Sequence, residues 1–285
     1  MCKLMTGDLG SFNLKFNSGG VYENRFLLDN ERDTFGFDTL EYEGNTYFFG
    51  QGHFNMEGLK TNKDTLVPLL FGLGKEGAAG HINIILHLPL REISRKNLIV
   101  ELLEGNTFEF KINGKANSIT FDKVGVLKEG FSSFYSLPKR NEGLIAVIDI
   151  GGRTTDIFTF VDGKQEKEDS IAIGTMNYFD KIATKLIGMG QNRVMEEIHK
   201  LISKKIIDLN DFEDVTQKVF DEMINEMLLK FPHLNDYNIK LCGGGAEYFE
   251  KQFKNKFKKV SVLSNNMTSN VDGAERIGKA KGLDK

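Results

Sequence analysis

The stretch VIDIGGRTTDIF, residues 147–158, decides the fold, because the chain already contains a variant of it, MTGDLGSFNLKF, at residues 5–16. Each copy runs from an apolar segment through an aspartate, Asp8 or Asp149, into a glycine-containing turn and then into a second strand-like segment. This order predicts one β-hairpin in each half of the chain. Two such hairpins facing each other form a clamp for the phosphates of a nucleotide, so the repeat predicts a two-lobed nucleotide hydrolase.

The turn residues of the first copy suit phosphate binding. Gly10 lets backbone amides approach phosphate oxygens, and the side chains of Ser11 and Asn13 can donate hydrogen bonds. Lys15 shares their side of the strand by the two-residue period, so we expect it to pair with the β- or γ-phosphate unless it is a solvated strand lysine. The matching cradle of the second copy consists of Gly151, Gly152, Arg153, Thr154 and Thr155, of which Arg153 could instead point to solvent.

The two aspartates are the predicted metal site. Mg²⁺ prefers an octahedral shell and keeps several waters, so a carboxylate often holds it indirectly. Asp8 and Asp149 each follow an apolar strand and would hold the hydrated ion from both sides. The alternative is that each aspartate only stabilises a tight turn, where this residue type is common. The matching context of the two copies favours the metal.

Glu129 is the candidate for orienting the water that attacks the γ-phosphate. The segment KEGF, residues 128–131, lies between a strand and an apolar helix, which places the carboxylate near a helix N-terminus. Asp156 of the second hairpin would assist, and Asp149 completes the predicted catalytic group through the metal. The alternative is a structural acid, because the helix dipole also favours a carboxylate at this position.

A third segment, LCGGGAE at residues 241–247, is expected to contact adenosine. It follows an apolar strand and opens a helix, and small residues there let a base and ribose pass close to the backbone. Its candidate binding residues are Gly243, Gly244, Gly245 and Glu247. The alternative is a strand-to-helix turn with no ligand. A helix at residues 192–201 would supply the ribose contact through one of Glu196, Glu197 and Lys200.

Composition limits the class of protein. The chain of 285 residues is long enough for two domains of ordinary size, and its net charge of −3 gives no general attraction to nucleic acid or anionic membrane. The two cysteines, Cys2 and Cys242, lie at opposite ends, which argues against a disulfide framework and favours a reducing compartment. The apolar runs are too short to cross a bilayer, and the N-terminus lacks a signal-peptide pattern. We therefore expect a cytoplasmic protein without membrane contact and without direct contact to nucleic acid.

The order of the expected elements indicates two related α/β lobes. Hairpins come first in each half, and helices and strands then alternate. The apolar segment 144–150 predicts a strand covered on both faces, whereas residues 118–121 and 124–127 are expected to form two separate strands. We assign residues 1–143 with 264–285 to the first domain and residues 144–263 to the second.

In content and order, these motifs resemble those of the actin/Hsp70/sugar-kinase superfamily. Residues 8–15 match its first phosphate motif, residues 149–156 the second and residues 242–247 the adenosine motif. Glu129-Gly130 and residues 271–282 match the two connecting helices. The resemblance spans nearly the whole chain. It implies an actin-like α/β fold of two RNase H-like lobes, with ATP or GTP and Mg²⁺ in a cleft between them.

Within the superfamily, the chain most resembles the bacterial actin-like proteins that segregate plasmids, the ParM type. This resemblance is carried by DIGGRTTD at residues 149–156, IILHLPL at residues 84–90, and FGQG at residues 49–52 followed by KTNK at residues 60–63. Arg153 departs from some relatives, which carry glycine or threonine there. The resemblance implies a nucleotide-dependent, filament-forming ATPase that segregates plasmid DNA through a ParR-like adaptor protein. The alternative is a small-molecule kinase, although the chain lacks a sugar-binding Asn-Asp signature.

Overall fold

The structure is a computed structural model that describes residues 3–54, 59–61 and 65–285. Cys2 and the last two residues of the KTNK segment, Asn62 and Lys63, lie outside the described residues. The chain forms two compact units, one made of residues 1–138 and 267–285 and the other of residues 139–266. Within the described ranges, no helix is long and apolar enough to cross a membrane.

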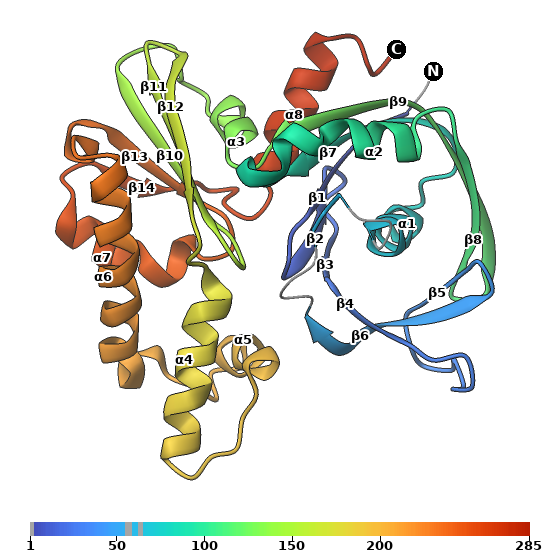
Figure 1. The fold of residues 1–285 in the computed structure, drawn as a ribbon, viewed down its shortest axis with the longest axis horizontal. Coiled ribbons are helices and arrows are strands. Elements are labelled where there is room, and N and C mark those ends of the chain that lie inside the picture. The colour runs from blue at the N-terminus through green and yellow to red at the C-terminus, as the bar shows by residue number, and fades with distance from the viewer. Residues whose placement is uncertain (1–2, 55–58, 62–64) are drawn as a thin grey trace. The chain divides into compact units, whose positions relative to one another are not determined.

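A nine-stranded sheet forms the first unit, in the order β3-β2-β1-β7-β9-β8-β5-β6-β4 (Figure 1). Its strands are β1 (Lys3–Leu9), β2 (Asn13–Phe16), β3 (Val21–Glu23), β4 (Arg25–Leu28), β5 (Thr39–Tyr42), β6 (Asn45–Phe54), β7 (Gly80–Leu88), β8 (Thr107–Ile112) and β9 (Lys115–Lys128). Strand β1 pairs with β2 in the antiparallel sense and with β7 in the parallel sense. The carboxyl ends of β1 and β7 therefore meet at one edge of the sheet.

Helices cover both faces of this sheet. They are α1 (Leu66–Lys75), the 3₁₀ helix η2 (Leu90–Arg95), α2 (Lys96–Leu103), α3 (Phe131–Ser136) and α8 (Ser269–Ala280). Successive residues of a strand face opposite ways. Met5 belongs to the large core that contains Leu70 of α1, whereas Leu4 packs with Ala274 of α8. Helices α1 and α8 thus lie on opposite faces, and the sheet curves around α1 (Figure 1).

The second unit has a five-stranded sheet in the order β12-β11-β10-β13-β14. Its strands are β10 (Leu144–Ile150), β11 (Thr155–Val161), β12 (Lys164–Ile171), β13 (Asn238–Cys242) and β14 (Val260–Val262). Its helices are α4 (Thr175–Gly188), α5 (Met195–Ser203), η3 (Leu209–Phe212), α6 (Glu213–Lys230), η4 (Leu234–Asp236) and α7 (Ala246–Lys256). Strand β10 is buried from its second residue to its last, as its apolar sequence predicts for a strand covered on both faces.

The two hairpins quoted above are equivalent in register. In the first, Asp8 lies opposite Lys15, and the turn comprises residues 10–13. In the second, Asp149 lies opposite Asp156, and the turn comprises residues 151–154. Each first strand also has a parallel neighbour, β7 for β1 and β13 for β10. Each aspartate therefore occupies the same position in its own unit.

One expected feature of the first unit is wrong. Residues 118–121 and 124–127 belong to a single strand, β9, which extends from Lys115 to Lys128. The charged pair Asp122-Lys123 lies between the two segments, but both residues are exposed and the strand continues through them with a register shift against β7. Their charge reflects an exposed stretch of strand rather than a loop.

Candidate functional site

The Asp8 carboxylate is held by two ammonium groups. Lys15 lies opposite Asp8 in the hairpin, and its Nζ is 3.0 Å from Asp8 Oδ2. The Nζ of Lys60 lies 3.4 Å from the other oxygen, Oδ1. Asp8 is 3% exposed, so this charge cluster is shielded from water. The arrangement is a buried anion with more positive than negative charge around it.

These neighbours keep Asp8 ionised. Burial alone would raise the pKa of the Asp8 carboxyl, but the charges of Lys15, Lys60 and His87 and the hydrogen bond from Lys15 lower it more. The net effect holds the pKa of Asp8 well below its usual range. At neutral pH the group is a fixed negative charge at the carboxyl end of β1.

Lys60 also forms an ion pair with Glu129, so one ammonium group bridges two carboxylates. Burial would lower the pKa of Lys60, but Glu129 and Asp8 raise it above its usual value. The side chains of Lys60 and Glu129 are 11% and 14% exposed. Sequence reasoning did not assign Lys60 to the site, because its segment has no periodic pattern and lies far from Asp8 and Glu129 in sequence.

The turn of the first hairpin leaves no room for a side chain at Gly10. A Cβ on Gly10 would lie 2.7 Å from the carbonyl oxygen of Asn13, which is too close for any other residue without a shift. Asn24, which directly follows β3, stabilises the turn by donating its side-chain amide to Gly10 O at 2.8 Å and its backbone amide to Phe12 O at 2.9 Å. Ser11 and Asn13 are half-buried in this turn. Their roles toward a phosphate stay predictions.

In the second unit, Asp149 and Asp156 face each other across β10 and β11 and are 6% and 2% exposed. Thr154 Oγ1 donates to Asp156 Oδ2 at 3.4 Å, and the Gly151 amide donates to Thr154 O at 2.9 Å. Arg153 is half-buried at the tip of the turn. The structure thus brings Asp149, Asp156 and Thr154 into one small cluster.

Helix α4 fixes the position of this second turn. The amides of Thr175 and Met176, in its first turn, donate to Gly151 O at 2.9 Å and to Gly152 O at 2.8 Å. Gly174, which precedes the helix, lies so close that an added Cβ would be 2.5 Å from Gly152 O. The glycines therefore allow the helix N-terminus to approach the turn backbone, a packing role that sequence reasoning did not assign.

The predicted adenosine segment forms the turn between β13 and α7. Gly243 has a φ of +81°, and an added Cβ would lie 2.2 Å from Asp149 Oδ1. An added Cβ on Gly245 would lie 2.3 Å from Ile150 Cγ2, and the Gly245 amide donates to Ile150 O at 2.9 Å. These two glycines are thus required by packing against β10, whether or not a ligand is present.

The remaining predicted residues of this unit are less enclosed. Gly244 is half-buried, and Glu247 is exposed and accepts a hydrogen bond from Asn266 Nδ2 at 3.3 Å. On α5, Glu196 is half-buried while Glu197 and Lys200 are exposed. Their contacts to a base or ribose stay predictions.

The two buried aspartates suit a metal ion that binds together with a nucleotide, not one that is held by protein ligands alone. Among the described residues, no group of three or more His, Cys, Asp and Glu side chains could hold a metal ion. Mg²⁺ is commonly bound by one or two carboxylates together with phosphates and water. Asp8 and Asp149, each buried at the end of a strand, fit that requirement within their own units.

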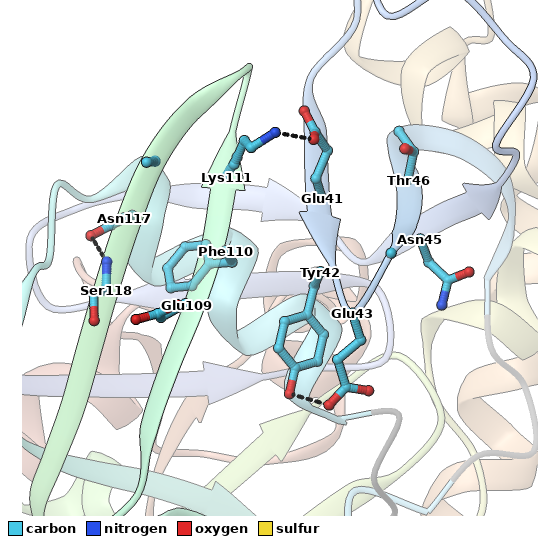
Figure 2. A pocket seen from close by; sticks show the side chains of 12 residues that line it. Glu41, Tyr42, Glu43, Asn45, Thr46, Glu109, Phe110, Lys111, Asn117 and Ser118 are labelled. Atoms are coloured by element: carbon cyan, nitrogen blue, oxygen red, sulfur yellow. Dashed lines mark hydrogen bonds and ion pairs between the residues drawn. The ribbon is translucent and has the colours of Figure 1, made fainter.

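A concavity of about 740 Å³ in the first unit is separate from these residues (Figure 2). It is lined by the β5–β6 turn and by β8 and β9, and Lys111 of β8 pairs with Glu41 of β5 at 2.8 Å across it. None of the predicted site residues lines it. It therefore adds nothing to the nucleotide assignment.

Comparisons with known proteins agree with the fold. The family described as archaeal actin homologue MreB-like, C-terminal, matches residues 147–255. The sequence matches no curated protein. Its fold is similar to that of Ta0583, an archaeal actin homolog, with a TM-score of 0.85 and 15% identity over 98% of this chain and 99% of that chain. The complex of Ta0583 with ADP gives a TM-score of 0.83 at 14% identity, again over 98% and 99% of the two chains.

Filament-forming proteins of bacteria are also similar. A subunit of a 15-stranded ParM filament from Clostridium botulinum gives a TM-score of 0.78 at 19% identity, over 98% of this chain and 100% of that chain. AlfA from the B. subtilis plasmid pLS32, in its filament, gives 0.66 at 19% identity over 96% and 98% of the two chains. At these identities the likeness shows the fold, and the actin-like α/β fold that the family resemblance implied is confirmed: the chain has an actin-like fold.

Proposed function

We propose that this protein is a nucleotide-dependent, filament-forming ATPase of the actin type. The observation that carries the proposal is the equivalence of the two hairpins, each with a buried aspartate at the end of its first strand and a turn in the same register. One hairpin in each unit would contribute donors to the same nucleotide, ATP or GTP. The solved complex of Ta0583 with ADP supports nucleotide binding by this fold.

The residues divide the chemistry among themselves. Backbone amides of the two turns, with Ser11, Asn13 and Lys15, would bind phosphate oxygens. Asp8 and Asp149 would hold Mg²⁺ through its waters, and the ion would neutralise phosphate charge. Glu129 would orient the attacking water, assisted by Asp156.

Lys60 supplies a way to couple binding to catalysis. Its ammonium is shared between Asp8 and Glu129. A γ-phosphate brings strong negative charge that competes for the same ammonium group. Binding would draw Lys60 from Glu129 and leave the Glu129 carboxylate able to accept a hydrogen bond from water.

The proposal extends to assembly and its use. A head-to-tail contact between identical subunits does not close on itself and so propagates as a filament. Bound nucleotide would shift the population toward the conformation in which identical subunits can stack head to tail. The filaments of ParM and AlfA support self-association. We further propose that filaments move plasmid DNA in the cytoplasm through a separate ParR-like adaptor, because the net charge of −3 gives no general affinity for DNA.

Electron microscopy and sedimentation test the proposal. Wild-type protein should form filaments with Mg²⁺ and ATP or GTP and stay unassembled without nucleotide. Glu129→Gln should still assemble but release phosphate slowly, so its filaments should outlast those of the wild type. A protein that stays monomeric with every purine triphosphate, yet phosphorylates a sugar or small acid, would refute the proposal in favour of a small-molecule kinase.

A further inference from the structure

One side chain of helix α8, Asn270, holds the backbone next to Glu129. Its Oδ1 accepts a hydrogen bond from the Gly130 amide at 2.9 Å and another from the Ser133 hydroxyl at 2.8 Å. Asn270 is 5% exposed and Ser133 is fully buried, so bulk water competes little for these bonds. Gly130 has a φ of +75°, which turns the chain sharply between Glu129 and α3. Asn270 therefore fixes the turn that directs the Glu129 side chain.

A buried histidine ties the same contact to strand β1. A carbonyl oxygen only accepts, so His87 Nδ1 donates to Gly7 O at 3.0 Å, and Nε2 of the neutral ring then accepts from the Ser132 hydroxyl at 2.8 Å. Ser132 Oγ also lies 3.2 Å from Asn270 Oδ1, but its single proton is directed to His87. The two lone pairs of Asn270 Oδ1 then serve Gly130 and the neighbouring serine. Neutral His87 thus keeps Asn270 available to the turn.

Helix α8 follows one of the connections between the two units. The chain returns to the first unit at residue 267, and α8 begins at Ser269. Helices α3 and α8 pack backbone against backbone, since a Cβ added to Gly273 would lie 1.7 Å from Ser132 O. Such close packing is stiff, because any displacement of one helix meets backbone atoms of the other. A shift of the connection would therefore reach Asn270 and, through it, Gly130.

We propose that Asn270 is a positioning residue for nucleotide hydrolysis, which orients the Glu129 carboxylate through the Gly130 amide and links that orientation to the connection that enters α8. This inference rests on the proposed function, because Asn270 acts through Glu129 and needs no contact with the nucleotide. Misplacing a reacting group by about 1 Å can cost about 10²-fold in rate. Loss of the Asn270 contact should therefore lower turnover and leave nucleotide affinity unchanged.

The test compares three variants for phosphate release and for affinity toward Mg·ATP, at protein concentrations where sedimentation gives equal polymer. Asn270→Ala should lower kcat by roughly 10-fold to 10²-fold while Kd stays within about twofold of wild type. Asn270→Asp keeps an acceptor oxygen in place and should restore most of the turnover. Ser269→Ala is the matched control: Ser269 is 1% exposed and its replacement removes a hydrogen bond to Ser133 in the same helix contact, whereas the Gly130 amide donates to Asn270. Its kcat should stay within about twofold of wild type.

A double-mutant cycle separates this inference from the proposed function. If Asn270 acts through Glu129, Glu129→Gln combined with Asn270→Ala should be no slower than Glu129→Gln alone. Additive losses, or equal losses in Asn270→Ala and Ser269→Ala, would overturn the positioning role. If Glu129→Gln leaves turnover unchanged, the catalytic assignment of Glu129 is wrong and the inference falls with it. If Asn270→Ala unfolds below the assay temperature, Asn270→Ser takes its place. The serine hydroxyl is too short to reach the Gly130 amide, so the same decrease in kcat is expected.

Discussion

Replacing Lys60 by methionine removes the ammonium group that bridges Asp8 and Glu129 but keeps most of the apolar stem. Breaking a buried ion pair by removing one partner costs about 3–5 kcal/mol, because the other charge stays buried and uncompensated. Asp8 retains Lys15 at 3.0 Å, so the loss falls mainly on Glu129. We therefore expect the free energy of unfolding of Lys60→Met to fall by about 3 kcal/mol, at the lower end of that range.

Urea unfolding at pH 7 and low salt, without nucleotide, measures this loss. For a domain of this size, about 3 kcal/mol corresponds to a decrease in Tm of roughly 6–12 °C. The matched control is Lys111→Met, whose ion pair with Glu41 spans 2.8 Å but whose side chain is 52% exposed. Exposed pairs contribute only about 0–1 kcal/mol. Adding Glu129→Gln to Lys60→Met should recover stability, because the carboxylate that lost its ion pair with Lys60 is gone. Equal losses in the two lysine variants, or no recovery in the double variant, would refute the bridging role.

Three further predictions concern pH, packing and the second aspartate. Burial holds the pKa of His87 below its ordinary value, although the charge of Asp8 acts to raise it, so the unfolded chain gains a proton near pH 6.5 that the folded chain does not. The free energy of unfolding should therefore decrease as pH falls below about 6.5. His87→Gln should show a shallower decrease in urea titrations from pH 7.5 to 5.5. Gly245→Ala should lower the free energy of unfolding by about 1–3 kcal/mol in thermal melts, because its Cβ would lie 2.3 Å from Ile150 Cγ2. In the same melts, the control Gly188→Ala should be neutral or slightly stabilising, because its Cβ would meet no atom within 4 Å. Asp149→Asn should weaken Mg·ATP binding by more than tenfold in calorimetry while Tm stays near the wild-type value, and unchanged affinity would show that Asp149 is a turn residue only.

The sequence predicts the architecture because the repeated hairpin is local. The spacing of Asp8 and Lys15 matches that of Asp149 and Asp156, so turns of equal length place the two pairs in the same register. The dipeptide Asn113-Gly114 is likewise typical of a two-residue hairpin turn, and both residues have a positive φ between β8 and β9. Features encoded within about ten residues were thus accessible without the structure.

The contacts around Glu129 were not accessible, because they join segments far apart in the chain. Lys60 reaches Glu129 from the KTNK segment, whose sequence carried a family resemblance but indicated no role for the lysine, and Asn270 reaches Gly130 from the last helix. A lysine or asparagine in isolation is more typical of a solvated surface than of a buried contact. The structure adds a packing role against β10 for Gly243 and Gly245, whose contact with a ligand stays a prediction.

Calorimetric titration of Mg·ATP, or Mg·GTP, into the unassembled protein tests the central claim most directly, namely that the two hairpins form a single nucleotide site. The account predicts one nucleotide per chain and a loss of that same binding event in both Asp8→Ala and Asp149→Ala, since each hairpin supplies part of one site. Absence of heat with either nucleotide would contradict the account. So would two sites per chain, with each alanine variant abolishing only one of them.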